Sequence, residues 1–214
     1  PDGKWFTLEF IGNRHDPYSD IGMVSAQGGK IINLTNSGYT SGFPRWVLDG
    51  NAILFITERY GMRAHASWGS LNDVMLVFMN QDAYDKFRLS KEDYELQKEL
   101  EKEQKNTTET KKNDKKKGDN KEKSEEKKEE KVKDIVVELN NIEDRIVRLT
   151  PNSSDLGSAI ITKDGETLYY LSAFEGGYDL WKMNLRKKDT KLLHKMDADG
   201  PTWKWTRMER TCSC

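Results

Sequence analysis

The sequence predicts an all-β fold made of short antiparallel strands, and the first observation behind this prediction is a repeated turn. An Asp-Gly pair followed by an apolar or aromatic strand occurs at Asp2-Gly3, Asp49-Gly50 and Asp164-Gly165. In each copy an aspartate heads a later strand, and a Leu-Thr pair or its equivalent follows. Asp-Gly favours tight hairpin turns, and four antiparallel strands in a period of about forty residues are typical of a propeller blade. We therefore expect a partial β-propeller of about three four-stranded antiparallel blades, with a charged helical or disordered insertion.

Residues 151–196 contain the clearest copy of the repeat and are predicted to be a complete propeller blade. The four strands of this blade are expected near residues 159–162, 167–170, 178–183 and 190–193. Residues 1–36 are predicted to be an incomplete blade that lacks its inner strand. The strands that it keeps are expected at about residues 5–11, 20–25 and 31–35.

Residues 38–150 are predicted to be a further blade, interrupted before its outer strand by a charged insertion at residues 82–134. Within the insertion, Ser90 and Asp93 form a capping-box-like pattern, and residues 94–104 favour a helix. Residues 105–133 are almost entirely Lys, Glu, Asp, Asn and Thr. Such a segment buries too little apolar surface to offset its ordering entropy, so we expect a disordered excursion or a frayed helix.

Composition excludes several classes of function. Hydrophobic residues make up 35% of the chain and charged residues 33%, but much of that charge lies in the insertion. The net charge is −1, which gives no reason to expect nucleic acid or an acidic membrane as a partner. No apolar run approaches the length of a membrane span. We also expect no cofactor and no metal site.

Residues 197–214 should begin another blade, because Asp199-Gly200 repeats the turn. From about residue 201 the sequence instead becomes rich in Trp and Arg and ends in Cys212 and Cys214. Two cysteines in a Cys-x-Cys pair do not complete a metal site. Back-translation in the neighbouring frame restores an Asp-Gly turn in register, so we interpret the tail as a frameshift product.

The candidate functional residues lie in the long loop that precedes Asp73. Arg63, His65 and Trp68 supply a cation, a titratable donor and an aromatic face, a combination that suits peptide contact. The alternative is a well-packed loop at the rim of a blade. Ser70, His65 and Asp73 contain the residue types of a catalytic triad, but nothing in the sequence brings them together, and no catalytic residue is predicted.

The sequence resembles a known family in residues 46–55, 58–63, 67–73 and 142–151. These runs resemble the amino-terminal β-propeller region of bacterial tricorn-like serine peptidases, and the general repeat resembles that of TolB. In the peptidase family the propeller precedes a PDZ domain and a peptidase domain, which carry the catalytic serine and histidine. Neither domain is present in this sequence, so the resemblance assigns no catalytic residue and implies an inactive fragment truncated before them.

The resemblance implies a gating role, in which the propeller guides peptides or unfolded polypeptide toward a missing catalytic domain. The channel-facing residues would then come from the inner strands at residues 43–47 and 157–162. The alternative is a TolB-like protein-binding propeller without peptidase activity. A third interpretation, the propeller of a prolyl oligopeptidase-type enzyme, has less support, because no Gly-x-Ser-x-Gly motif is present. The resemblance implies that the partners are the remaining blades and the peptidase domain. Self-association through exposed blade edges is also expected. The family further implies that the parent protein is periplasmic.

Overall fold

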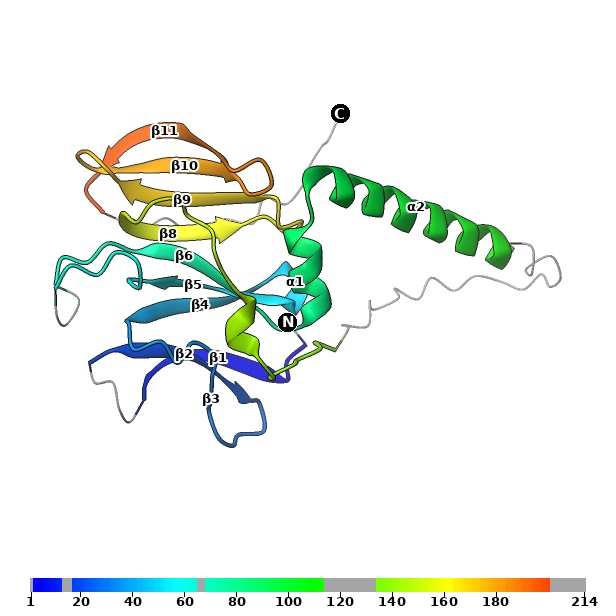
Figure 1. The fold of residues 1–214 in the computed structure, drawn as a ribbon, viewed down its shortest axis with the longest axis horizontal. Coiled ribbons are helices and arrows are strands. Elements are labelled where there is room, and N and C mark those ends of the chain that lie inside the picture. The colour runs from blue at the N-terminus through cyan, green and yellow to red at the C-terminus, as the bar shows by residue number, and fades with distance from the viewer. Residues whose placement is uncertain (1, 13–16, 65–67, 114–133, 201–214) are drawn as a thin grey trace, which may run out of the picture.

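Three antiparallel sheets stand side by side in a stack, and two helices extend from one side of it (Figure 1). The computed structural model describes residues 2–12, 17–64, 68–113 and 134–200. Within each sheet the strand order follows the chain order, so every strand pairs with its sequence neighbour. Consecutive antiparallel strands packed face to face with the next group are the arrangement of propeller blades. The predicted all-β, partial propeller of about three blades is therefore confirmed.

The first sheet contains three strands in the order β1-β2-β3. Their bounds are Trp5–Ile11 for β1, Ser19–Ser25 for β2 and Ile32–Asn33 for β3. The last strand is shorter than the predicted 31–35. Leu34 still donates its backbone NH to the carbonyl of Ile21, but the next residue, Thr35, uses its hydroxyl to contact the head of β2.

The second sheet has the order β4-β5-β6-β7 and occupies the middle of the stack. Its strands are Ser41–Val47 for β4, Ala52–Thr57 for β5, Asp73–Phe78 for β6 and Ile146–Arg148 for β7. Short 3-10 turns precede β5 and β7, namely η1 at Leu48–Gly50 and η3 at Ile142–Arg145. Every residue of β5 and β6 is buried. The reason is that a neighbouring sheet covers each face, which explains why these strands are continuous apolar runs.

Alternate residues of β5 and β6 contribute to two separate cores. Leu54 and Leu76 belong to the core shared with the third sheet. Phe55 and Met75 belong to the core shared with the first sheet, which also includes Met23. The period-two alternation of a strand thus distributes one sheet between two interfaces. The middle sheet consequently holds the stack together.

The third sheet has four strands in the order β11-β10-β9-β8. They are Asp155–Ile161 for β8, Thr167–Ala173 for β9, Tyr178–Asn184 for β10 and Asp189–Ala198 for β11. These observations fit the strands expected in residues 151–196. The predicted domain boundaries themselves stay a prediction, and residues 201–214, with the proposed frameshift and both cysteines, lie outside the described residues.

The Asp-Gly pair supplies positive φ angles at both of its residues in the β4–β5 turn, but only at its glycine in the β8–β9 turn. Between β8 and β9, Gly165 has a φ of +71°, while Asp164 instead accepts a hydrogen bond from the backbone NH of Glu166. Between β4 and β5, positive φ values begin one residue earlier, at Leu48. In that turn Asp49 and Gly50 also have positive φ values, +54° and +90°, as expected of the pair. In the β8–β9 turn the aspartate therefore acts through its side chain, as Asx turns do, and the glycine provides the left-handed backbone.

The insertion begins with a packed helix that the sequence did not predict. Helix α1 spans Gln81–Arg88, and the side chain of Asn80 accepts its N-cap hydrogen bond from the NH of Ala83. Phe87 of α1 packs on Phe78 of β6, with ring centroids 5.0 Å apart. The start of the insertion therefore covers the core rather than leaving it.

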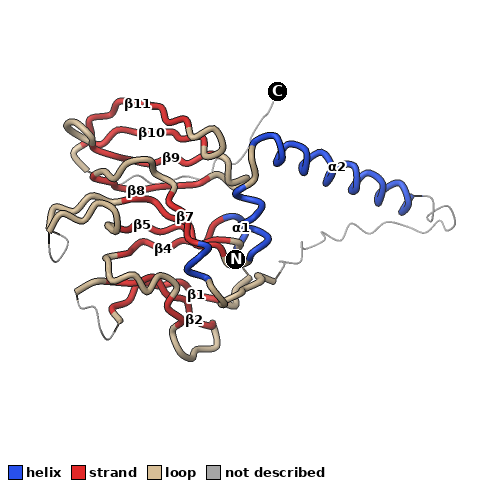
Figure 2. The backbone as a smooth tube through the Cα atoms, in the orientation of Figure 1, coloured by secondary structure: helices blue, strands red, loops and turns tan. Residues whose placement is uncertain are grey.

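Helix α2 spans Lys91–Asn113 and extends away from the sheets (Figures 1 and 2). As the capping-box pattern predicted, the Ser90 hydroxyl accepts from the NH of Asp93. The helix continues into the segment for which a frayed helix was one expectation, while residues 114–133 lie outside the described residues. Neither of the two described helices is long and apolar enough to cross a membrane.

A pH dependence of stability follows from Tyr170, which lies between the second and third sheets and is 2% exposed. Burial raises the pKa of Tyr170 to about 12, although a hydrogen bond with Thr190 acts in the opposite direction. The unfolded chain loses this proton near pH 10, so the stabilisation is complete below that pH and is lost as the pH rises toward 12. We expect the free energy of unfolding to fall by on the order of 2–3 kcal/mol over this range.

Urea denaturation at a series of alkaline pH values measures this effect. The Tyr170→Phe variant should lack the Tyr170 part of the loss. A smaller loss should persist in this variant, because burial and a hydrogen bond to Asp155 also raise the pKa of Tyr178 to about 12. An unchanged alkaline profile in Tyr170→Phe would contradict the assignment.

Candidate functional site

The predicted site loop, residues 58–72, joins β5 to β6 and is fixed at its base. Gly61 donates to the carbonyl of Glu58, and Leu71 donates to the carbonyl of Gly61. A Cβ at Gly61 would lie 2.2 Å from the Leu71 carbonyl oxygen, so glycine is required for this close approach. Asn72 forms two backbone hydrogen bonds with Ser154, at 2.8 and 3.1 Å. The base of the loop therefore connects the second sheet to the third.

Of the three residues predicted to contact peptide, the structure describes Arg63 and Trp68 in this loop. Trp68 is 79% exposed, and Arg63 is exposed while its backbone NH donates to the hydroxyl of Ser70 at 3.4 Å. His65 lies outside the described residues. An exposed aromatic ring and an exposed cation are thus present on one loop with a fixed base. Whether they bind a peptide stays a prediction.

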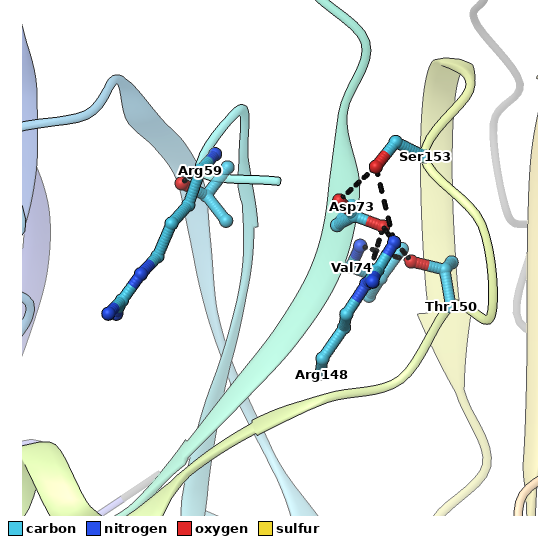
Figure 3. A network of polar contacts seen from close by, with 7 residues as sticks. Arg59, Asp73, Val74, Arg148, Thr150 and Ser153 are labelled. Atoms are coloured by element: carbon cyan, nitrogen blue, oxygen red, sulfur yellow. Dashed lines mark hydrogen bonds and ion pairs between the residues drawn. The ribbon is translucent and has the colours of Figure 1, made fainter. Parts of the chain in front are cut away.

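Asp73, the aspartate of the triad considered from residue types alone, has a different role. Asp73 heads β6, is fully buried, and accepts hydrogen bonds on both carboxylate oxygens (Figure 3). Nε and Nη2 of Arg148 contact Oδ1 at 2.9 and 2.8 Å, as does the Thr150 hydroxyl at 2.7 Å. The Ser153 hydroxyl contacts Oδ2 at 2.7 Å. A buried carboxylate requires such pairing, so Asp73 is committed to structure rather than to a Ser70–His65–Asp73 triad.

This arrangement joins the head of one strand to the end of the next, and we call it the Asp–Thr clasp. The Thr150 hydroxyl donates to Asp73 and accepts from the NH of Val74 at 3.2 Å, so β6 is tied to the segment after β7. Arg59, from the β5–β6 loop, lies apart from the clasp in Figure 3. The clasp therefore closes the second sheet at the end where β6 begins.

The same clasp recurs in the first sheet. The Thr35 hydroxyl donates to Asp20 at 2.6 Å and accepts from the NH of Ile21 at 3.0 Å. In the third sheet Asp179 accepts from the backbone NH groups of Asp197 and Met196, and these bonds hold its pKa below the ordinary value. The repeated aspartate of the sequence is thus explained as a strand-closing group.

The first strands of the second and third sheets share an irregularity that points to function. The pairing of β4 with β5 shifts between Gly42 and Arg45, and the pairing of β8 with β9 shifts at the equivalent place, between Leu156 and Ala159. Such bulges often redirect side chains near binding sites. Residues 43–44 and 157–158 therefore occupy equivalent bulges on strands expected to line the channel.

Phe43 is the residue that sequence analysis did not single out within the predicted channel run. Its φ is +57° and its side chain is 67% exposed. A bulky residue with a left-handed φ is an outlier that costs about 1–2 kcal/mol, and such strain concentrates at ligand-binding positions. The sequence feature that could have identified Phe43 was an aromatic residue between Gly42 and Pro44 on a predicted inner strand.

Phe43 and the site loop lie at the same end of the second sheet. Ser41, two positions before Phe43, pairs with Thr57, where β5 ends and the loop follows. Within the described part of the chain, no three His, Cys, Asp or Glu side chains gather as metal ligands would. The described residues thus define a partial β-propeller with exposed aromatic groups at one end and polar clusters that close its strands.

No family model matches this sequence, and no curated protein matches it. Among solved structures, the chain is similar to TolB from Acinetobacter baumannii, with a TM-score of 0.46, 10% identity, and coverage of 90% of this chain and 31% of that one. It is also similar to the tricorn protease, with a TM-score of 0.48, 9% identity, and coverage of 89% and 17%. Hydrazine synthase of Kuenenia stuttgartiensis has a TM-score of 0.51, 12% identity, and coverage of 90% and 24%.

These similarities concern the fold only, because all three identities are 12% or lower. Of the three, the hydrazine synthase chain has a TM-score above 0.5. This chain spans between 17% and 31% of the length of these structures. Fold similarity at this level does not assign an activity.

Proposed function

We propose that this chain is a non-catalytic propeller part of a tricorn-like serine peptidase, and that it guides or gates peptides toward a catalytic domain outside this sequence. The observation that carries the proposal is Phe43, an exposed aromatic side chain on a strained backbone in β4. The inner strands of a propeller surround its central channel. The resemblance of residues 46–55, 58–63 and 67–73 to that family supports the same assignment.

The proposed mechanism needs weak, sequence-tolerant contacts with an unfolded chain. An aromatic ring provides a large contact area with little loss of side-chain entropy, and it does not require a particular partner residue. Phe43 would supply this contact in the channel. Arg63, His65 and Trp68 would supply a cation, a titratable group and a second ring where the peptide enters. A fixed loop base keeps these groups at one end of the sheet.

A TolB-like protein-binding module is the second candidate. The observation that favours it is the outward face of the first sheet, where Phe6 is 63% exposed and Ile31 is 37% exposed. Exposed apolar side chains on a sheet face suit contact with a folded partner or with another blade. In this reading the first sheet, rather than β4 and the loop, would carry the binding activity.

The Phe43→Gly variant tests the proposal. Glycine accepts a positive φ without strain, so we expect the free energy of unfolding to change by less than about 1 kcal/mol. Loss of the ring should weaken binding of a fluorescein-labelled, reduced and alkylated polypeptide by about tenfold, a difference that fluorescence anisotropy can measure. Trp68→Ala should weaken the same binding to a smaller extent.

Phe6→Ala provides the matched control, since it also removes an exposed phenylalanine. This variant should bind the unfolded polypeptide like the unmodified chain. If Phe6→Ala weakens binding and Phe43→Gly does not, the protein-binding reading replaces the gating one. If the unmodified chain does not bind the unfolded polypeptide, the gating proposal fails.

A further inference from the structure

A hollow of about 590 Å³ lies where the insertion meets the second and third sheets. Three separate segments line this junction pocket: the end of α1 with the α1–α2 connection, the chain from β7 onward, and the end of β10 with the turn after it. Arg186 donates to the carbonyl of Leu89 at 3.1 Å, which joins the third sheet to the insertion. Figure 1 shows the α1–α2 connection beside that sheet. The volume is in the range of ligand sites in proteins.

The junction pocket is cationic. Its described lining includes Arg88, Arg148, Arg186 and Lys188 and contains no aspartate or glutamate. Arg148 is paired with Asp73 of the clasp. Arg88 contacts the Tyr84 hydroxyl and ring, which do not neutralise its charge. An apolar-walled hollow with unneutralised cations attracts an anionic group.

Arg186 is a cation of this pocket that is held in a fixed position. Its guanidinium carbon lies 3.5 Å from the centroid of the Tyr94 ring, so stacking holds the group in place. Its Nε is buried and has no hydrogen-bond partner among the described residues. A buried donor without a partner is destabilising, especially on a charged group. Stacking on Tyr94 and the bond to Leu89 thus hold the Arg186 cation without neutralising its charge.

The shape of the pocket favours an extended ligand. Strand β7 is the outermost strand of its sheet, and residues 147–151, which begin in it, line the pocket consecutively. The outer edge of a strand presents backbone donors and acceptors with which a further strand can pair. Apolar side chains, including Phe87, Leu89 and Met183, make up more than half of the lining. An extended chain with alternating apolar and acidic residues matches both features.

We infer that the junction pocket binds an acidic peptide in extended conformation along β7, with its carboxylates at Arg88, Arg186 and Lys188. Nucleic acid fits less well, because the lining is mainly apolar and the net charge of the chain is −1. The inference does not depend on the proposed channel function. The pocket adjoins the outer strand of the second sheet, whereas Phe43 lies on the first strand of that sheet.

The Lys188→Glu variant tests this inference by anisotropy with a short fluorescein-labelled peptide of alternating valine and glutamate. The unmodified chain should bind this peptide, and the variant should bind it at least about tenfold more weakly. Lys30→Glu is the matched control, because it makes the same charge change at an exposed residue before β3, and it should leave binding unchanged. Arg88→Ala should also weaken binding, through a different segment of the pocket.

Several results would overturn the inference. These are no binding by the unmodified chain, equal binding by the Lys188→Glu and unmodified chains, and equal weakening by Lys30→Glu. Equal binding of an alternating valine–lysine peptide would show that charge does not matter. Displacement of the acidic peptide by a short single-stranded oligonucleotide, with tighter binding of the latter, would replace the peptide with nucleic acid.

Discussion

Replacing Asp73 by alanine is expected to destabilise the chain by about 3–5 kcal/mol, because it breaks a buried ion pair by removing one partner. Asp73 is fully buried and accepts from Arg148, Thr150 and Ser153. Its loss leaves two hydroxyls and a guanidinium without their acceptor. The Arg148 side chain is 31% exposed and can recover some hydration, which places the expected loss toward the lower limit. Urea denaturation followed by tryptophan fluorescence measures this loss.

Two further variants make the Asp73 prediction specific. Asp189→Ala removes an exposed carboxylate that pairs with Lys191 at 3.1 Å, and it should change stability by less than about 1 kcal/mol. Thr150→Val should cost about 1–3 kcal/mol, because the NH of Val74 loses its acceptor and Asp73 loses a donor. If Asp73→Ala costs no more than Asp189→Ala, the clasp does not stabilise the sheet.

The clasp shows which part of the structure is local enough to predict from sequence. The spacing of the repeated aspartate and Leu-Thr pair indicated a sheet of consecutive strands, and the bounds expected for the strand at residues 5–11 agree with β1. Strands that pair with each other are joined by short connections, so the residues that specify their pairing lie close together in the sequence. The chemical role of Asp20 and Asp73 was not predicted, because it depends on which side chains meet after the sheet forms.

Other features depend on contacts between distant segments, and sequence analysis missed them. Arg186 contacts Leu89 across 97 positions of the chain, so no local pattern indicated the junction pocket. The strained backbone of Phe43 depends on the bulge between β4 and β5. Arg63 and Trp68 are exposed, but their binding role stays a prediction, and His65 lies outside the described residues.

Helix α1 was missed for a compositional reason. Residues 81–88 adjoin a highly charged segment and have few apolar positions of their own, so no helix was predicted there. Those positions nevertheless match the surface beneath them. Tyr84 and Phe87 both contact Phe78, with ring centroids 5.8 and 5.0 Å away. Tertiary packing therefore overrides the polar character of the segment.

Replacing Phe78 by alanine is accordingly expected to cost about 3–5 kcal/mol and to release α1. Phe78 is fully buried in the core between the second and third sheets and is the aromatic contact of both α1 rings. An eight-residue helix is unstable in water without tertiary contacts, so its amides should lose protection from hydrogen exchange. Urea denaturation and exchange measurements on the same variant test the two consequences.

Phe6→Ala is the matched control for this prediction, because Phe6 is 63% exposed and its removal should change stability by less than about 1 kcal/mol. Preserved protection of α1 in Phe78→Ala would mean that the Asn80 cap and the remaining contacts hold the helix without the aromatic cluster. Loss of protection in α1, with β6 and β7 still protected, would mean that the helix is an added layer on a sheet that forms without it. Simultaneous loss in all three would mean that the start of the insertion is part of the same cooperative unit as the second sheet, because Phe78 serves both the inter-sheet core and the helix.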